Sequence, residues 1–88
     1  MMFSLNQIVK VKEFAFRNKS GGTGLSSDWD EPFSKTVKVR ITKHWYDDEI
    51  GERAWAVPLE TETELIDYLK RNAKTMTVFV GQFDVCAE

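Results

Sequence analysis

The sequence has few of the residues that would place the chain outside the cell or in a membrane. Its one cysteine, Cys86, cannot form an internal disulfide, and a metal site of four cysteines is excluded. No apolar run approaches the roughly 18 residues that a membrane-spanning helix needs. The segment that begins at Met1 lacks the basic start and the long apolar core of a signal peptide. We therefore expect a protein of a reducing cytoplasm, without a membrane partner.

Groups that commonly carry out catalysis are also scarce. The single histidine, His44, is far in sequence from Cys86, and no motif pairs the two as base and nucleophile. No nucleophilic-serine motif is present. The acidic residues at 47–52 lack the alternating spacing of a calcium loop, and residues 21–24 lack the Lys-Ser or Lys-Thr pair of a phosphate-binding loop. These absences predict a protein that is not an enzyme and that uses neither a metal nor a cofactor.

The sequence also has no large excess of either charge, because its 12 basic and 14 acidic residues give a net charge of −2. That balance excludes a surface covered in carboxylates, and it lacks the basic excess typical of nucleic-acid modules. The placement of the charges therefore matters more than their sum. What the chain does contain is an ordinary globular composition, with 42% hydrophobic and 30% charged residues among 88. This length and composition predict one folded domain over residues 1–88.

The clearest strand pattern runs from residue 36 to residue 46. One set of alternate positions holds Val37, Val39, Ile41 and Trp45, and the other holds Lys38, Arg40, Thr42, His44 and Tyr46. This alternation is typical of an antiparallel strand with one face in the core and the other exposed to solvent. A second strand follows an acidic turn, so residues 36–59 are predicted to form a hairpin. Trp45 and Trp55 would then be cross-strand or core partners.

Two further segments have strand character. The apolar residues of 7–17 switch from one set of alternate positions to the other midway. A single strand that buries both sets on one face therefore needs a bulge near residues 12–13; the alternative is a strand buried on both faces. The two sets are Val9 with Val11 and Phe14 with Phe16. Residues 75–85 carry apolar side chains at both parities, which predicts a central or doubly covered strand. Gly81 within that strand predicts a bulge or a close approach.

One amphipathic helix is predicted after residue 60. Thr61 and Glu64 have the spacing of a capping box, in which each side chain bonds the backbone of the other residue. An apolar stripe follows, formed by Leu65, Ile66, Leu69 and Ala73. The order of elements is then β-β-β-α-β. This order predicts an α+β fold, with a small antiparallel sheet of about four strands and the helix packed on one face.

Residues 18–35 form the longest irregular stretch, and it is rich in glycine and serine. Loops of more than about 12–15 residues are uncommon in compact domains and are usually functional or disordered. This loop also carries Leu25, Trp29 and Phe33, which a solvated linker does not need. Trp29 either closes over the core or stands out as an interface anchor. Both interpretations stay open at this point.

The polar side of the strand at 36–46 is a second candidate surface. Basic and aromatic side chains project from it, and lysines of the first strand lie beside them if the two strands pair. The set is Lys10, Lys12, Lys38, Arg40, His44 and Tyr46. Some sheets hold RNA on a basic face that carries an aromatic ring. A solvated antiparallel face also carries lysine and arginine simply to stay soluble and to block edge-to-edge aggregation.

Two functional hypotheses follow. The leading one is a small non-enzymatic inhibitor that binds and occludes a macromolecular partner, foremost a protein, through the Gly-rich loop and the hairpin tip. The residues assigned to this contact are Trp29, Asp30, Phe33, Asp47, Asp48 and Glu49. The alternative is a small RNA-binding regulator that uses the basic face. A homodimer is open under either hypothesis.

The chain also resembles, in general style, the counter-defence proteins that phages and mobile elements encode, such as anti-CRISPR proteins. The likeness consists of its small size, its single helix on a small sheet, its acidic charge and its lack of a catalytic set. It implies a protein that blocks a host factor in the host-cell cytoplasm. No motif carries the likeness, so it assigns no residues.

Overall fold

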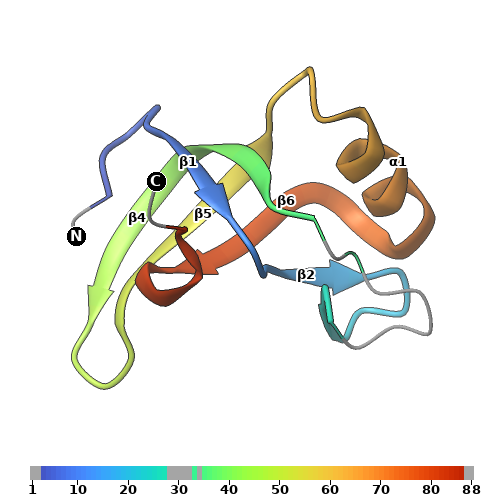
Figure 1. The fold of residues 1–88 in the computed structure, drawn as a ribbon. Helices are drawn as coiled ribbons and strands as arrows, with labels where there is room; N and C mark the ends of the chain where they lie inside the picture. Colours follow the sequence, from blue (N-terminus) through green and yellow to red (C-terminus); the bar gives the residue numbers. More distant parts are fainter. Residues whose placement is uncertain (1–2, 28–32, 34, 87–88) are drawn as a thin grey trace.

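The predicted α+β class is confirmed, and Figure 1 shows the helix and the sheet. The antiparallel sheet has six strands rather than about four. The computed structural model describes residues 3–27, 33 and 35–86. Its elements are β1 (Ile8–Val11), β2 (Ala15–Asn18), β3 (Thr23–Leu25), β4 (Val37–Asp47), β5 (Gly51–Pro58), α1 (Thr63–Asn72), β6 (Ala73–Gly81) and the short 3-10 helix η1 (Gln82–Asp84). The strands lie in the order β1-β4-β5-β6-β2-β3. The predicted hairpin is β4–β5, and β6 is central, as expected.

One extra strand arises where the sequence predicted a single bulged one. The chain breaks after β1, which pairs with β4, and resumes as β2, which pairs with β6 on the other side of the sheet. Because each half has its own partner, each can turn its apolar parity inward without a bulge. Val9 and Val11 are buried from the first half, and Phe14 and Phe16 from the second.

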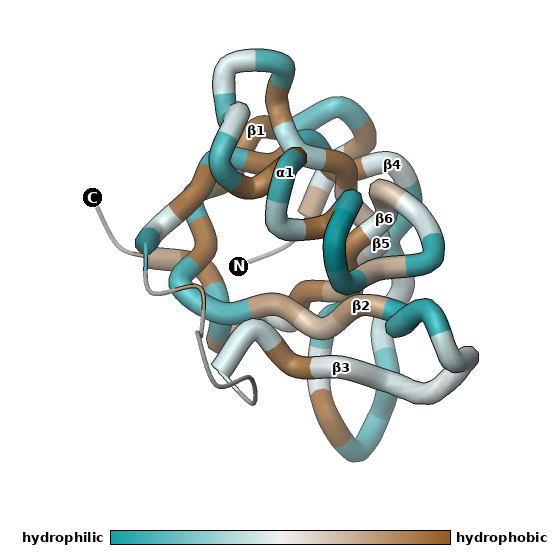
Figure 2. The backbone as a smooth tube through the Cα atoms, turned by 90° about the vertical axis from the view of Figure 1, so that its right-hand side faces the viewer, coloured by the Kyte–Doolittle hydropathy of each residue, from teal (hydrophilic) through white to brown (hydrophobic). Residues whose placement is uncertain are grey.

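The other extra strand lies inside the region predicted to be a loop, residues 18–35. β3 pairs with β2 over three residues, and Figure 2 shows the two segments side by side. Gly24 at its centre faces Phe16, and a Cβ built on Gly24 would lie 2.9 Å from the Phe16 ring. The phenylalanine therefore uses the space that a larger residue would fill. Three residues around a glycine give no strand signal in a sequence.

A bulge in β4 changes which side chains share a face. The pairing with β5 shifts between Ile41, which lies opposite Ala56, and Lys43, which lies opposite Trp55. Such a shift exchanges the two faces for every later residue of the strand. Trp45 therefore does not share the face of Val37 and Val39, as the sequence predicted.

Helix α1 packs on one face of the sheet. Leu65, Tyr68 and Leu69 are buried in the same core cluster as Val78 and Val80 of β6. The Tyr68 ring meets Phe16 edge-on at 5.8 Å and Phe14 at 6.2 Å between ring centroids. Tyr68 was not part of the predicted stripe, although it lies between Leu65 and Leu69 on the same helix face.

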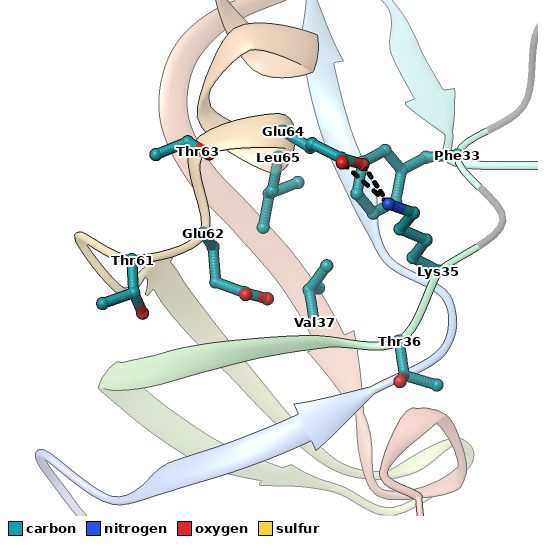
Figure 3. A pocket seen from close by; sticks show the side chains of 9 residues that line it. All are labelled: Phe33, Lys35, Thr36, Val37, Thr61, Glu62, Thr63, Glu64 and Leu65. Carbon is teal, nitrogen blue, oxygen red and sulfur yellow. Dashed lines mark hydrogen bonds and ion pairs between the residues drawn. The ribbon is translucent and has the colours of Figure 1, made fainter.

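The predicted capping box is wrong. The residue at the cap position is Glu62 rather than Thr61, and no side chain caps the helix. Glu62 instead accepts a hydrogen bond through Oε2 from the Lys38 backbone N–H at 2.8 Å. Glu64 pairs with Lys35 at 2.6 Å, as Figure 3 shows. Both carboxylates thus connect the start of α1 to the segment that enters β4, and tertiary contacts replace the local cap.

The C-terminal segment returns to the first strand. After η1, Val85 forms a bridge with Val11, and the Cys86 N–H donates to the Lys10 carbonyl at 2.7 Å. The edge of β1 that faces away from β4 is therefore partly covered. No helix among the described residues has the length and apolar character to cross a membrane.

Candidate nucleic-acid interface

The sheet face turned away from α1 is called the outer face here. Strand register defines it: Phe79 alternates with the buried Val78 and Val80, so it points away from the helix. Phe79 lies opposite Trp55 on β5 and opposite Ala15 on β2. Paired residues carry this face across the six strands, with shifts of register between Ile41 and Lys43 in β4 and between Phe16 and Asn18 in β2.

Three aromatic rings meet on the outer face and form the aromatic cluster, Trp45, Trp55 and Phe79. Trp55 meets Phe79 edge-on at 5.3 Å, and Trp45 lies 6.1 Å from Trp55 and 5.8 Å from Phe79. Trp55 is 37% exposed, and the other two rings are half-buried. Large aromatic rings that are partly exposed are common at binding surfaces.

Arg53 extends the cluster toward the end of β6. Its guanidinium lies 5.6 Å from the centre of the Phe79 ring, a cation–π arrangement. The side chain crosses Gly81, its cross-strand partner, where a Cβ would collide with Arg53 Nη1. Gly81 therefore provides the close approach that the sequence predicted. The Arg53 Nε is buried and has no hydrogen-bond partner within the described part of the chain.

Six basic side chains share the outer face or line a hollow beside it, and they are called the cationic rim: Lys10, Arg17, Lys38, Arg40, Lys43 and Lys74. The first five hold outward strand positions, and Lys74 lines a hollow next to Trp55. In the strands that the structure describes, Asp47 at the hairpin end is the one acidic residue of outward parity. Glu60 also lines a hollow beside Arg40. Glu13 and Asp84 line a further hollow beside Arg53 and Phe79, at the end of the face away from Lys74. Basic residues outnumber acidic ones on this face, although the protein is weakly acidic as a whole.

One pair in the cationic rim is unfavourable by itself. Lys10 of β1 lies directly opposite Lys38 of β4. Like charges in directly opposite positions destabilise a sheet. Both side chains are exposed, so the pair places two positive charges on neighbouring strands of the outer face.

Two hollows flank Trp55 on the outer face. One, of about 230 Å³, is lined by Ala15, Phe16, Arg17, Thr23, Trp55 and Phe79. The other, of about 340 Å³, is lined by Arg17, Trp55, Lys74, Thr75 and Thr77. Arg17 and Trp55 belong to both. Each hollow thus combines an indole ring, a guanidinium and at least one threonine hydroxyl.

The predicted basic set is only partly brought together. Lys10, Lys38 and Arg40 share the outer face. Lys12 lies beyond the end of β1, where its N–H donates to the Asp84 carbonyl. His44 and Tyr46 follow the bulge in β4 and take the opposite parity, opposite Ala54 and Glu52.

Sequence reasoning missed most of the rest of this surface. The missed residues are Trp45, Trp55 and Phe79 as surface rings, with Arg17, Lys43, Arg53 and Lys74 as their basic neighbours. Trp55 and Phe79 follow ordinary alternation and could have been found once the final strand was placed beside β5. Trp45 and Lys43 could not, because the bulge reverses their parity.

The predicted protein-binding set does not form one surface among the described residues. Trp29 and Asp30 lie outside the described residues. Phe33 is half-buried, and its ring lies 6.0 Å from Phe14 and 5.3 Å from Tyr68. Asp47 accepts hydrogen bonds from the backbone N–H groups of Glu49 and Ile50, at 2.8 and 3.1 Å.

The remaining acidic residues of that set stay on the surface. Asp48 and Glu49 are exposed at the tip of the β4–β5 hairpin. Among the residues that the structure places, no three side chains of histidine, cysteine or acidic type could hold a metal ion. Comparisons of the chain with protein-family models, with curated proteins and with solved structures found no match. Function is therefore inferred from the geometry of the surfaces themselves.

Proposed function

We propose that the protein acts by binding rather than by catalysis, and that its ligand is a nucleic acid, foremost RNA, held on the outer face. The observation that carries this proposal is the cationic rim around the aromatic cluster. Lysine and arginine attract phosphate oxygens, and aromatic rings stack on bases. Both are present within one sheet face, so this alternative is better supported than occlusion of a protein partner.

The separation of charge supports the proposal despite the net charge of −2. The cationic rim concentrates six of the chain's 12 basic residues on one face. Helix α1 presents a mixed surface on the other side, with Glu64 and Asp67 early and Lys70 and Arg71 late. An uneven field of this kind attracts a polyanion to one side of a molecule whose total charge is negative. The lone thiol of Cys86 fits a cytoplasmic site of action.

The test is the salt dependence of RNA binding, measured by fluorescence anisotropy on a labelled oligonucleotide. Replacing Lys38 and Arg40 together by alanine removes two cations from the cationic rim. We expect weaker binding to all sequences alike and a log–log salt slope that is smaller by about 1.4–1.8, since each phosphate contact contributes about 0.7–0.9.

The matched control is the double variant Lys70→Ala/Arg71→Ala, which removes two exposed cations from the last turn of α1. It changes the net charge by the same amount but leaves the outer face intact, so we expect the wild-type slope. Absence of wild-type binding to RNA and to DNA at low salt would refute the proposed function.

Occlusion of a protein partner is a second candidate, and the hairpin tip favours it. Tyr46 is 70% exposed and Ile50 is 44% exposed, beside the exposed carboxylates of Asp48 and Glu49. An aromatic ring with an aliphatic neighbour and a polar rim is typical of an interface hot spot. Such a contact fits an inhibitor of the phage or mobile-element style, in which a small protein blocks a host factor.

Capture of a defined host protein, identified by mass spectrometry and repeated with the purified partner, tests this candidate. We expect Tyr46→Ala to abolish capture and to leave the melting temperature nearly unchanged, because the ring is mostly solvent-exposed. The variant Lys38→Ala/Arg40→Ala should capture the partner normally. The opposite pattern would assign the captured protein to the outer face instead.

A further inference from the structure

We propose that the outer face binds single-stranded rather than double-stranded nucleic acid, with one unpaired base stacked on Trp55 in the hollow beside Arg17. The inference rests on the proposed function and deepens it. It names the kind of strand and the place where a base is held. It is tested through the aromatic cluster and the hollows, whereas the proposed function is tested through the charges of the cationic rim.

Neighbouring residues hold Trp55 in place, so its indole ring can serve as a fixed platform for a stacked base. Phe79 meets it edge-on at 5.3 Å, and Trp45 supports it from the neighbouring strand at 6.1 Å. The backbone at Trp55 is held as well, because its carbonyl accepts a hydrogen bond from the Thr42 hydroxyl at 3.2 Å. More than a third of the residue still faces solvent. A ring fixed in this way loses little conformational freedom when a base stacks on it.

The hollows give the platform a second wall. Arg17 faces the same two hollows as Trp55, so a flat ring placed there has an indole and a guanidinium within reach. Unpaired bases commonly stack on aromatic rings and on arginine planes. Thr23 lines one hollow, and Thr75 and Thr77 line the other. Their hydroxyls can donate to or accept from the exposed edge of a base.

The cationic rim lies on both sides of this platform. In the sheet order, β5 and β6 carry Trp55 and Phe79 and lie between β4 and β2. Lys38, Arg40 and Lys43 stand on the β4 side, with Arg17 on the β2 side. A single strand can therefore lay its phosphates along the rim while its bases turn toward the aromatic cluster.

A duplex cannot use this arrangement, because its bases are already stacked on one another and show only their edges in the grooves. A protein partner fits it less well for a different reason. Protein interfaces contain less lysine than the rest of a protein surface, whereas the outer face carries lysines at 10, 38, 43 and 74. Charge and ring geometry together thus favour an unpaired strand.

The experiment compares three labelled probes of equal length, oligo(U), oligo(dT) and a DNA duplex, in anisotropy titrations at fixed low salt. We expect the two single strands to bind more tightly than the duplex. Trp55→Ala should weaken single-strand binding about ten-fold or more, the loss of one stacked base, with the salt slope unchanged. Trp55→Phe should restore most of the affinity, because it keeps a ring at the same place.

Two controls keep the result interpretable. Thermal melts of both Trp55 variants show whether the sheet is intact. The variant Phe83→Ala removes a ring that is 73% exposed and lines neither hollow, so it should leave affinity unchanged. Equal or tighter binding of the duplex would overturn the inference, as would single-strand affinity unaffected in a folded Trp55→Ala. Either result leaves the proposed function standing. Only a failure to bind any of the three probes would remove both.

Discussion

Two glycines of the sheet are required by what lies next to them rather than by their backbone angles. At Gly24 the missing side chain leaves room for the buried Phe16 ring, and at Gly81 it leaves room for the Arg53 side chain. The two neighbours differ in how far they can move. Phe16 is fixed among core residues, whereas Arg53 is long and partly exposed. A methyl group at position 24 is therefore the more harmful of the two.

We expect Gly24→Ala to destabilise the protein by about 1–3 kcal/mol, the usual effect of overpacking a core. The matched control is Gly22→Ala in the same hairpin, where the added carbon meets only the Asn18 side chain at 3.3 Å. Urea unfolding of both variants provides the comparison. Equal stability of the two would show that Phe16 can leave its position and that β3 is not a firm part of the sheet.

At the scale of elements, α1 begins differently from what its sequence predicted. Its position and its buried face follow from local pattern, because Leu65 and Leu69 are buried as expected. Its first turn does not, because Glu62 bonds a backbone group of β4. Capping patterns describe a helix by itself. Here, pairing with a distant strand places that carboxylate where the local cap would have been.

We expect Glu62→Ala to destabilise the protein by about 1 kcal/mol, because the Lys38 N–H loses a charged acceptor. Thr61→Ala should change stability by less than about 0.5 kcal/mol, as for other exposed positions. Thermal melts at neutral pH compare the two. A larger loss for Thr61→Ala would restore the capping box and contradict the contact between Glu62 and β4.

The strands show where sequence pattern succeeds and fails. The β4–β5 hairpin was predictable because its first half alternates cleanly between buried and exposed residues. The bulge between Ile41 and Lys43 was not, since both Thr42 and Lys43 are polar and either could be the extra residue. The separation of β1 from β2 was not predictable either. The switch of the apolar residues from odd to even positions is the same in the sequence whether one strand bulges or two strands pair with different neighbours.

At the scale of the whole molecule, the C-terminal segment partly covers the β1 edge of the sheet. η1 carries the chain from β6 back to β1, where Val85 and Cys86 contact Val11 and Lys10. No local sequence pattern predicts this contact, because it joins segments at opposite ends of the described chain. The same is true of the candidate site. Arg17, Trp55 and Lys74 come together only through the order of strands in the sheet.

We expect removal of residues 85–88 to destabilise the protein by about 1–3 kcal/mol, through loss of a backbone hydrogen bond and of Val85 packing. It should also cause concentration-dependent self-association, because the exposed β1 edge offers unpaired backbone groups to another chain. Thermal melts and light scattering measure the two effects. Removal of residues 87–88 alone is the control and should do neither. A monomeric and fully stable shorter chain would show that the β1 edge needs no cover.

The bridge between Val11 and Val85 also bears on the order of events in folding. Contacts between segments far apart in the chain form late, because closing a long loop costs entropy before the contact stabilises anything. The β4–β5 hairpin joins neighbouring segments and can form on the microsecond scale typical of hairpins, about 1–10 μs. Lys10 reaches Lys38 only once β1 has paired with β4. A partly folded molecule that has formed only this hairpin would therefore already have Trp45 beside Trp55 but would lack part of the positive charge of the outer face. Its attraction for an anion would increase as the remaining strands pair.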